Sequence, residues 1–164
     1  MDNVSARIES TMREINDRVT HGMKARAYSA ANELRNSSQM ILRGQRSGRT
    51  YNVPGTGRMK YNKRNKTATI TYRKYTASAQ GEPPAVRTGA FRNSWQAKTK
   101  TIRSGTNITV TPYVESSIRT DNGSHLLGAV LEYGTRRIAP RPHHDKIRQH
   151  ALPKIKKIYK RPYF

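Results

Sequence analysis

Three histidines and an aspartate near the C-terminus are the residues of this chain whose types come closest to a catalytic or metal-binding set. They are His143, His144, Asp145 and His150. Adjacent histidines on a helix point about 100° apart, and His143 and His150 are two turns apart with no third ligand in register. We therefore expect a structural or surface role for them, and we predict neither a metal site nor a cofactor.

The remaining chemistry-bearing residues give no positive indication of an enzyme. Acidic residues are too few and scattered for a carboxylate pair, and Glu82, Glu115 and Glu132 suit salt bridges in a basic protein equally well. The GTGR at Gly55 is too short for a phosphate-binding loop. We predict no catalysis. One enzymatic alternative is a small hydrolase that uses His143 or His144. Replacing both histidines by alanine without loss of function would exclude it.

The length and composition favour one modest domain over residues 1–164. Hydrophobic residues make up 34% of the 164 and aromatic residues 7%, so the core is small for the length. A small core stabilises a lone domain only marginally, which suggests packing against other subunits. No apolar run approaches the roughly 20 residues that span a bilayer, and the N-terminus lacks the apolar stretch of a signal peptide. We expect no membrane partner. Cysteine is absent, which excludes disulfides.

Charge is the strongest compositional signal. The chain has 32 Lys and Arg against 10 Asp and Glu, a formal net charge of +22. Residues 34–81 contain eleven basic residues and no acidic one. Nucleic acid or an acidic protein surface is therefore an expected neighbour. Tyr51 and Tyr61 lie within this basic stretch, where they could stack on bases or simply pack.

Apolar spacing predicts one long helix over residues 3–42. Its stripe recurs at steps of three and four, at Val4, Ile8, Met12, Ile15, Val19, Met23, Ala27, Ala30 and Leu34. The stripe is narrow, so we expect the helix to lie across a sheet or a neighbouring subunit. A plain core-packing helix is compatible with the same pattern.

Residues 44–66 are predicted as a long basic loop or arm, because Gly, Arg, Lys, Asn and Ser dominate and Pro54-Gly55 marks a turn. Alternation then predicts strands over residues 67–75, 95–102 and 107–114. The last two form an antiparallel hairpin, to which 67–75 is a possible third strand. Pro112 implies an edge strand or a bulge.

Three further segments complete the prediction. Pro83 and Pro84 hold an extended stretch, after which Thr88 caps a short helix over residues 89–95 that carries Phe91 and Trp95 on one face. Ser124 is expected to cap a helix over residues 125–133, which Gly134 ends. A final helix follows Pro142 and continues, kinked, through Pro153. The predicted fold class is α+β: the long N-terminal and kinked C-terminal helices pack on a small antiparallel sheet, with a long basic arm or loop.

Three segments, in this order and spacing, resemble a known family. They are YTASAQGEPPAVRTGAFRNSW at residues 75–95, LLGAVLEYGT at 126–135 and IAPRPHHDKIRQHA at 138–151. Together they resemble the neck or tail-completion proteins of tailed bacteriophages, the gene-product-ten-like minor tail components. The matching positions are Pro84, Thr88, Gly89, Phe91, Arg92 and Ser94, then Glu132, Tyr133, Gly134 and Thr135, then Arg141 and Pro142. The chain departs from that pattern at Arg87 and His143.

The resemblance implies a structural virion protein made in the host cytoplasm. Its copies would form a ring, six-fold in symmetry, that joins head-closure or connector proteins to tail terminator or tail tube proteins at the head–tail junction. Genomic double-stranded DNA would pass through the channel. The alternative from charge alone is a free, non-sequence-specific nucleic-acid-binding protein of histone-like or ribosomal type, which would bind with a steep dependence on salt.

Two sets of candidate residues follow from this interpretation. Residues predicted to contact other subunits or partners are Arg87, Thr88, Phe91, Arg92, Trp95, Glu132, Tyr133 and Arg141. Residues predicted to line the arm or the DNA channel are Arg43, Arg46, Arg49, Arg58, Lys60, Lys63, Arg64 and Lys66.

Overall fold

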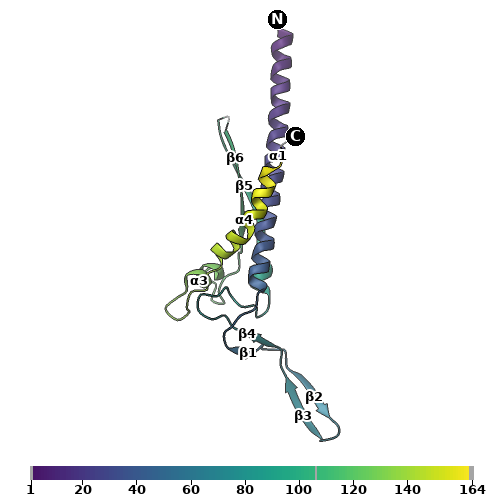
Figure 1. Cartoon of the computed structure of the whole chain (residues 1–164), viewed down its shortest axis with the longest axis vertical. Helices are drawn as coiled ribbons and strands as arrows, with labels where there is room; N and C mark the ends of the chain where they lie inside the picture. Colours follow the sequence, from purple (N-terminus) through teal and green to yellow (C-terminus); the bar gives the residue numbers. More distant parts are fainter. Residues whose placement is uncertain (1, 106, 163–164) are drawn as a thin grey trace. The chain divides into compact units, whose positions relative to one another are not determined.

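The computed structural model describes residues 2–105 and 107–162 and has the predicted α+β composition. Two compact units are distinguished. One contains the chain up to Ser37, the segment Trp95–Glu115 and the segment from Arg148 onward. The other contains Ser38–Ser94 and Ser116–Ile147. The chain has ten helices and strands in its described residues. Figure 1 shows them coloured from purple at the N-terminus to yellow at the C-terminus.

Helix α1 spans Asp2–Arg43, within a residue of the predicted helix at each end. No proline interrupts it, and its buried residues in the first unit are small: Ala27, Ala30, Ala31 and Ser37 are almost fully covered. Small side chains allow a close approach by another helix. Helix α4, His144–Lys160, supplies that neighbour with Ala151, which is fully buried.

Two polar contacts fix the pairing of α1 with α4 in the first unit. His150 Nδ1 lies 3.0 Å from Ser37 Oγ, and Lys154 Nζ lies 3.3 Å from a carboxylate oxygen of Glu33. Glu33 precedes Ser37 on α1, whereas its partner Lys154 follows His150 on α4, so the two helices run antiparallel. Helix α4 continues through Pro153 as one helix, as the sequence predicted.

Strands β5, Gln96–Ser104, and β6, Asn107–Glu115, form the predicted hairpin. Burial alternates along β6, with Ile108, Val110 and Val114 on the more covered face. Pro112 pairs with Thr99 without a break in register. Both strands of a two-stranded sheet are edge strands. Among the described residues no further strand pairs on the outer side of β6, so the missing N–H of Pro112 removes no hydrogen bond there.

The second unit corrects two predictions about strands. The segment expected to be a loop or arm contains β1, Thr50–Asn52, and β2, Arg58–Asn62. The predicted strand over residues 67–75 is two strands, β3, Thr67–Thr71, and β4, Lys74–Thr76. Neither joins the β5–β6 hairpin, because β2 pairs with β3 and β1 pairs with β4. Backbone pairing within the basic segment replaces the expected third strand.

Both short helices of the second unit begin later than predicted. Helix α2 spans Ala90–Asn93, and Gly89, with φ of 88°, occupies the cap position, although Thr88 Oγ1 does accept the N–H of Ala90 at 3.3 Å. Trp95 lies beyond this helix and is buried in the other unit. Helix α3 spans Leu127–Tyr133 and has no side-chain cap, so the prediction for Ser124 is wrong. Gly134 ends it with φ of 73°, as predicted.

Candidate functional site

Glu132 holds the start of helix α4. Its Oε2 accepts the backbone N–H of His143 at 2.9 Å and that of His144 at 3.2 Å. A helix start leaves N–H groups without partners and carries partial positive charge, so a carboxylate is well placed there. The side chain of Glu132 is only 12% exposed. A carboxylate from α3 thus supplies a cap that the sequence at His143 does not provide.

His143 is fully buried against this carboxylate. Its Nδ1 lies 2.8 Å from Glu132 Oε2 and 3.1 Å from the carbonyl oxygen of Arg141. Phe91 packs edge-on against the ring, with the centroids 5.6 Å apart. Burial lowers the pKa of His143, and the nearby His144 lowers it further, while the Arg141 carbonyl and Glu132 oppose the shift. The imidazole is therefore held in its neutral form at neutral pH.

Glu132, His143 and His144 also form the group whose ligand atoms lie within 4.8 Å of one another. Such a set resembles a two-histidine, one-carboxylate metal site. A carbonyl oxygen can only accept a hydrogen bond, so Nδ1 of His143 carries the proton that it shares with Arg141. Metal binding by His143 would therefore use Nε2, as is usual for a histidine whose Nδ1 donates to a carbonyl oxygen. The carboxylate of Glu132 already accepts the N–H groups at the start of α4, so helix capping accounts for its position.

The three segments that resemble phage neck proteins are joined by hydrogen bonds in the second unit, which contains most of their residues. Arg141 donates from Nη1 to the carbonyl oxygen of Ser78 at 3.1 Å, and its backbone N–H donates to Leu131 at 2.7 Å. Lys146 Nζ donates to the carbonyl oxygen of Gly81 at 3.0 Å. Phe91, Glu132 and Arg141, expected at a subunit interface, thus make their described contacts within the chain.

Arg46, expected in the arm, instead joins the end of α1 to the proline segment. Its guanidinium donates to the carbonyl oxygen of Ile41 at 2.9 Å and twice to that of Pro84, at 3.1 and 3.3 Å. Burial lowers the pKa of Arg46, but a guanidinium remains charged in proteins. Glu82 lies nearby and accepts hydrogen bonds from Ala79 N and from both Ser47 N and Ser47 Oγ. Glu82, expected as a salt-bridge partner, is therefore held mainly by hydrogen bonds from Ser47 and Ala79.

The β2–β3 hairpin divides its side chains between two faces. Side chains alternate along each strand, and the register pairs Met59 with Ile70 and Tyr61 with Ala68. A Cβ built on Gly57 would lie 3.0 Å from Tyr72, which places that ring on the same side. The opposite face carries Arg58, Lys60, Asn62, Thr67, Thr69 and Thr71. All ten strand residues are exposed. The hairpin thus has one apolar and one basic face, and neither is covered.

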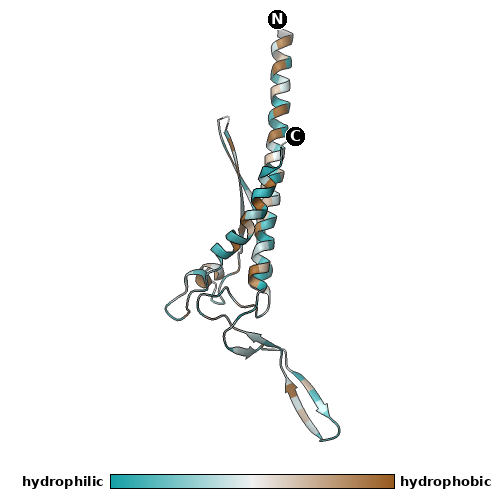
Figure 2. Ribbon diagram, viewed as in Figure 1, coloured by the Kyte–Doolittle hydropathy of each residue, from teal (hydrophilic) through white to brown (hydrophobic). Residues whose placement is uncertain are grey.

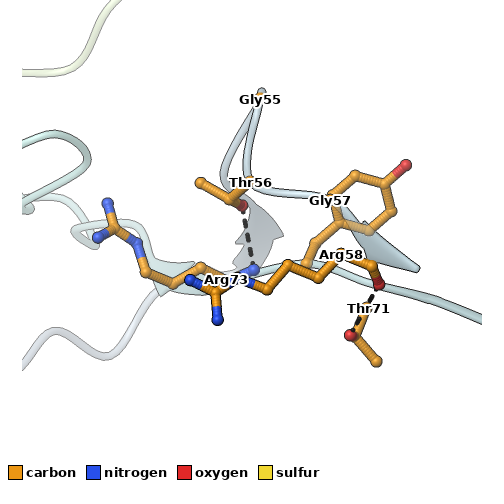
Figure 3. A pocket seen from close by; sticks show the side chains of 7 residues that line it. Gly55, Thr56, Gly57, Arg58, Thr71 and Arg73 are labelled. Carbon is orange, nitrogen blue, oxygen red and sulfur yellow. Dashed lines mark hydrogen bonds between the residues drawn. The ribbon is translucent and has the colours of Figure 1, made fainter. Parts of the chain in front are cut away.

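An open hollow of about 590 Å³ lies at the base of this hairpin (Figure 3). Thr56 Oγ1 accepts the backbone N–H of Arg73 at 3.1 Å, and Thr71 Oγ1 donates to the carbonyl oxygen of Arg58 at 3.2 Å. These bonds close the turn that begins at Pro54. The hollow is framed by two arginines and by Tyr72 and therefore has a basic rim.

The other predicted residues are dispersed. Lys63, Arg64 and Lys66 form the hairpin turn with Arg58 and Lys60 on β2, as one basic arm. Arg49 lies 5.7 Å from the ring centre of Tyr51, which stacks on Tyr75. Arg43 ends α1. Arg87, Thr88 and Tyr133 are exposed, and Arg92 is half-buried beside Asn93. Of the eight residues predicted for the arm or channel, five thus lie together on the β2–β3 hairpin, whereas Arg43, Arg46 and Arg49 lie on other parts of the chain.

A second exposed apolar surface lies on the N-terminal half of α1. Val4, Ile8, Met12 and Ile15 are 50–65% exposed, although they continue the stripe that is buried further along. Figure 2 shows hydrophobic residues recurring along this half of the helix. Within residues 2–105 and 107–162, no helix has the length and apolarity to cross a membrane. The apolar residues of this half recur at steps of three and four, so this part of α1 is amphipathic.

Comparisons of the chain with protein-family models, with curated proteins and with solved structures found no match. The resemblance to phage neck proteins therefore depends on the three segments themselves and stays a prediction.

Proposed function

We propose that this chain is a structural subunit of a tailed-phage neck, where copies of it form a ring that joins head-closure proteins to the tail. The observation that carries this proposal is the pair of uncovered apolar surfaces, on α1 and on the β2–β3 hairpin. Contiguous exposed apolar surface marks interaction sites in proteins that fold stably. A subunit that completes its core only in an assembly would have these features.

The three motif segments support the same function from another direction. The hydrogen bonds of Glu132, His143 and Arg141 connect the three segments to one another. The connected segments would hold the rest of the chain in place for contact with neighbouring subunits. The proposal assigns the chain no catalytic step and no cofactor. The five basic residues of the hairpin would face DNA in the channel or an acidic protein surface.

Negative-stain electron microscopy of the purified chain, in low and in high salt, tests the proposal. We expect closed rings of uniform diameter with a central channel in both conditions, because apolar contacts are not screened by salt. Particles without rotational order in both conditions would contradict it.

The basic face of the hairpin supports a second candidate, a free nucleic-acid-binding protein. Arg58 and Lys60 project from one side of a two-stranded ribbon, a shape that the major groove of DNA admits. This function requires binding of duplex DNA by the isolated chain, with a logarithmic salt slope of about −0.9 per phosphate contact. A slope near zero would remove it.

A further inference from the structure

The apolar face of the β2–β3 hairpin requires a cover that the described chain does not give it. Met59 is 71% exposed and its cross-strand partner Ile70 is 57% exposed. A two-stranded hairpin alone is at best marginally stable in water, because it buries too little apolar surface to offset its loss of conformational entropy. The hairpin is therefore expected to be ordered by whatever packs on Met59, Tyr61, Ile70 and Tyr72.

We propose that this apolar face packs on the exposed α1 stripe, formed by Val4, Ile8, Met12 and Ile15, of a second copy of the chain. The sizes of the two surfaces are similar. From Arg58 to Asn62 strand β2 rises about 13 Å at 3.3 Å per residue, and the helix rises about 17 Å from Val4 to Ile15 at 1.5 Å per residue. The hairpin face would cover most of the length of the stripe.

Charge selects the helix as the partner of the hairpin. From Arg58 to Thr71 the chain has five basic residues and no acidic one, so two hairpins would repel each other. From Asp2 to Arg18, by contrast, four acidic residues stand against three basic ones in a chain of net charge +22. Four of the other acidic residues, Glu33, Glu82, Glu115 and Glu132, have partners within the chain, and on α1 itself Glu9 pairs with Arg13. The start of α1 therefore lacks the excess positive charge by which one hairpin would repel another.

This inference rests on the proposed function, the ring of copies, and names the surfaces through which neighbouring copies would bind each other. A hairpin on one copy and a helix on the next are two different surfaces, so the interface is heterologous, the kind that generates rings. Pairing of α1 with α1 would be two-fold and would give dimers. The contact also leaves the face with Arg58 and Lys60 turned away from the protein.

Crosslinking between single-cysteine variants tests the contact, and the absence of native cysteine makes the result unambiguous. Met59→Cys chains are mixed with Ile8→Cys chains and treated with a short bis-maleimide, which tolerates small differences in register. We expect a covalent dimer from this mixture and at least tenfold less from either variant alone. Lys60→Cys and Arg13→Cys, on the opposite faces of the same two elements, are the matched controls and should give little dimer in the mixture.

Four results would overturn the inference. Dimers from Ile8→Cys chains alone would show helix–helix pairing, and dimers from Met59→Cys chains alone would show hairpin–hairpin pairing. A Met59→Cys/Ile8→Cys double variant that crosslinks only within one chain would place the hairpin on its own α1. Absence of the mixed dimer also overturns the contact. If microscopy shows rings but the mixed dimer is absent, the proposed function stands and only the contact is wrong. If rings and mixed dimer are both absent, the proposed function and the contact are both wrong.

Discussion

Glu132 stabilises the chain through the start of α4, and replacing it measures that contribution. Glu132→Ala removes the acceptor of the His143 and His144 N–H groups. We expect a loss of about 2 kcal/mol in the free energy of unfolding, the upper range for removal of a cap. Urea denaturation followed by circular dichroism measures it. Tyr133→Ala, at the exposed neighbouring position, is the control and should change stability by less than about 0.5 kcal/mol. Equal effects would contradict the capping role.

His143 should make stability depend on pH. Burial lowers its pKa in the folded chain below the ordinary value of 6.5, so the folded state binds fewer protons than the unfolded state. Its contribution is therefore complete above pH 6.5 and is lost as the pH falls from 6.5 through the lowered folded pKa. Thermal melts at pH 7.5 and 5.5 should show this loss.

Asparagine variants show whether this pH dependence belongs to His143. His143→Asn retains a side-chain N–H near the position of Nδ1 but does not titrate, so its melting temperature should fall less between pH 7.5 and 5.5 than that of the unmodified chain. His144→Asn, at the exposed neighbour, should retain most of the decrease, because burial is the larger cause of the lowered pKa of His143. A decrease that His143→Asn leaves unchanged would contradict this assignment.

At the scale of elements, the pairing of α1 with α4 depends on small residues. Ala30 and Ala151 are fully buried, so Ala30→Leu adds three carbons where no space is left. Overpacking of this kind costs about 1–3 kcal/mol. Urea denaturation should show that loss, whereas Ala25→Leu, exposed on the same helix, should have little effect. Equal stability of both variants would mean that the helices do not pack closely at Ala30.

The hairpin turn contains an unfavourable backbone conformation at Lys66, whose φ is 50°. Glycine adopts this region without a steric penalty, so Lys66→Gly should stabilise the hairpin by about 0.5–1 kcal/mol. Nuclear magnetic resonance chemical shifts of β2 and β3 would report a larger strand population. Lys63→Gly, in the same turn but without a positive φ, should lower that population. An opposite ranking would contradict the turn geometry.

Local periodicity made α1, α4 and the β5–β6 hairpin predictable. The stripe from Val4 to Leu34 and the alternation around Val110 can each be recognised within a single segment. Strand β2 was missed because Arg58 and Lys60 gave it the composition of a loop, although Met59 and Tyr61 alternate with them. Strand β1 pairs with β4 across 26 residues, from Thr50 to Thr76, which no local pattern encodes.

The candidate site was less predictable than the fold. Glu132 precedes His143 by eleven residues, and only the fold brings its carboxylate to the helix start. One signal was present: α4 begins at a histidine instead of a good capping residue, and an acidic residue is rare in so basic a chain. Arg46 was assigned to the arm on charge alone, because its burial against Pro84 depends on tertiary packing.

At the scale of the whole molecule, the β2–β3 hairpin can be removed without removing the elements next to it in the chain. Replacing residues 58–71 with a short Gly-Ser turn spares Arg46, Ser47 and the β1–β4 pair. We expect the helical circular dichroism to be retained and assembly to be lost, since the hairpin face is gone. Ring formation and particle assembly that survive this deletion would contradict a role for the arm.

The measurement that tests the central claim most directly is the mass of the unmodified chain in solution, by light scattering after size exclusion, at low and at high salt. The account predicts one discrete multiple of 18.7 kDa that is the same in both, because the contacts that hold the assembly are apolar. A mass of 18.7 kDa at both salts, rising only when duplex DNA is added, would contradict it and favour the nucleic-acid-binding alternative.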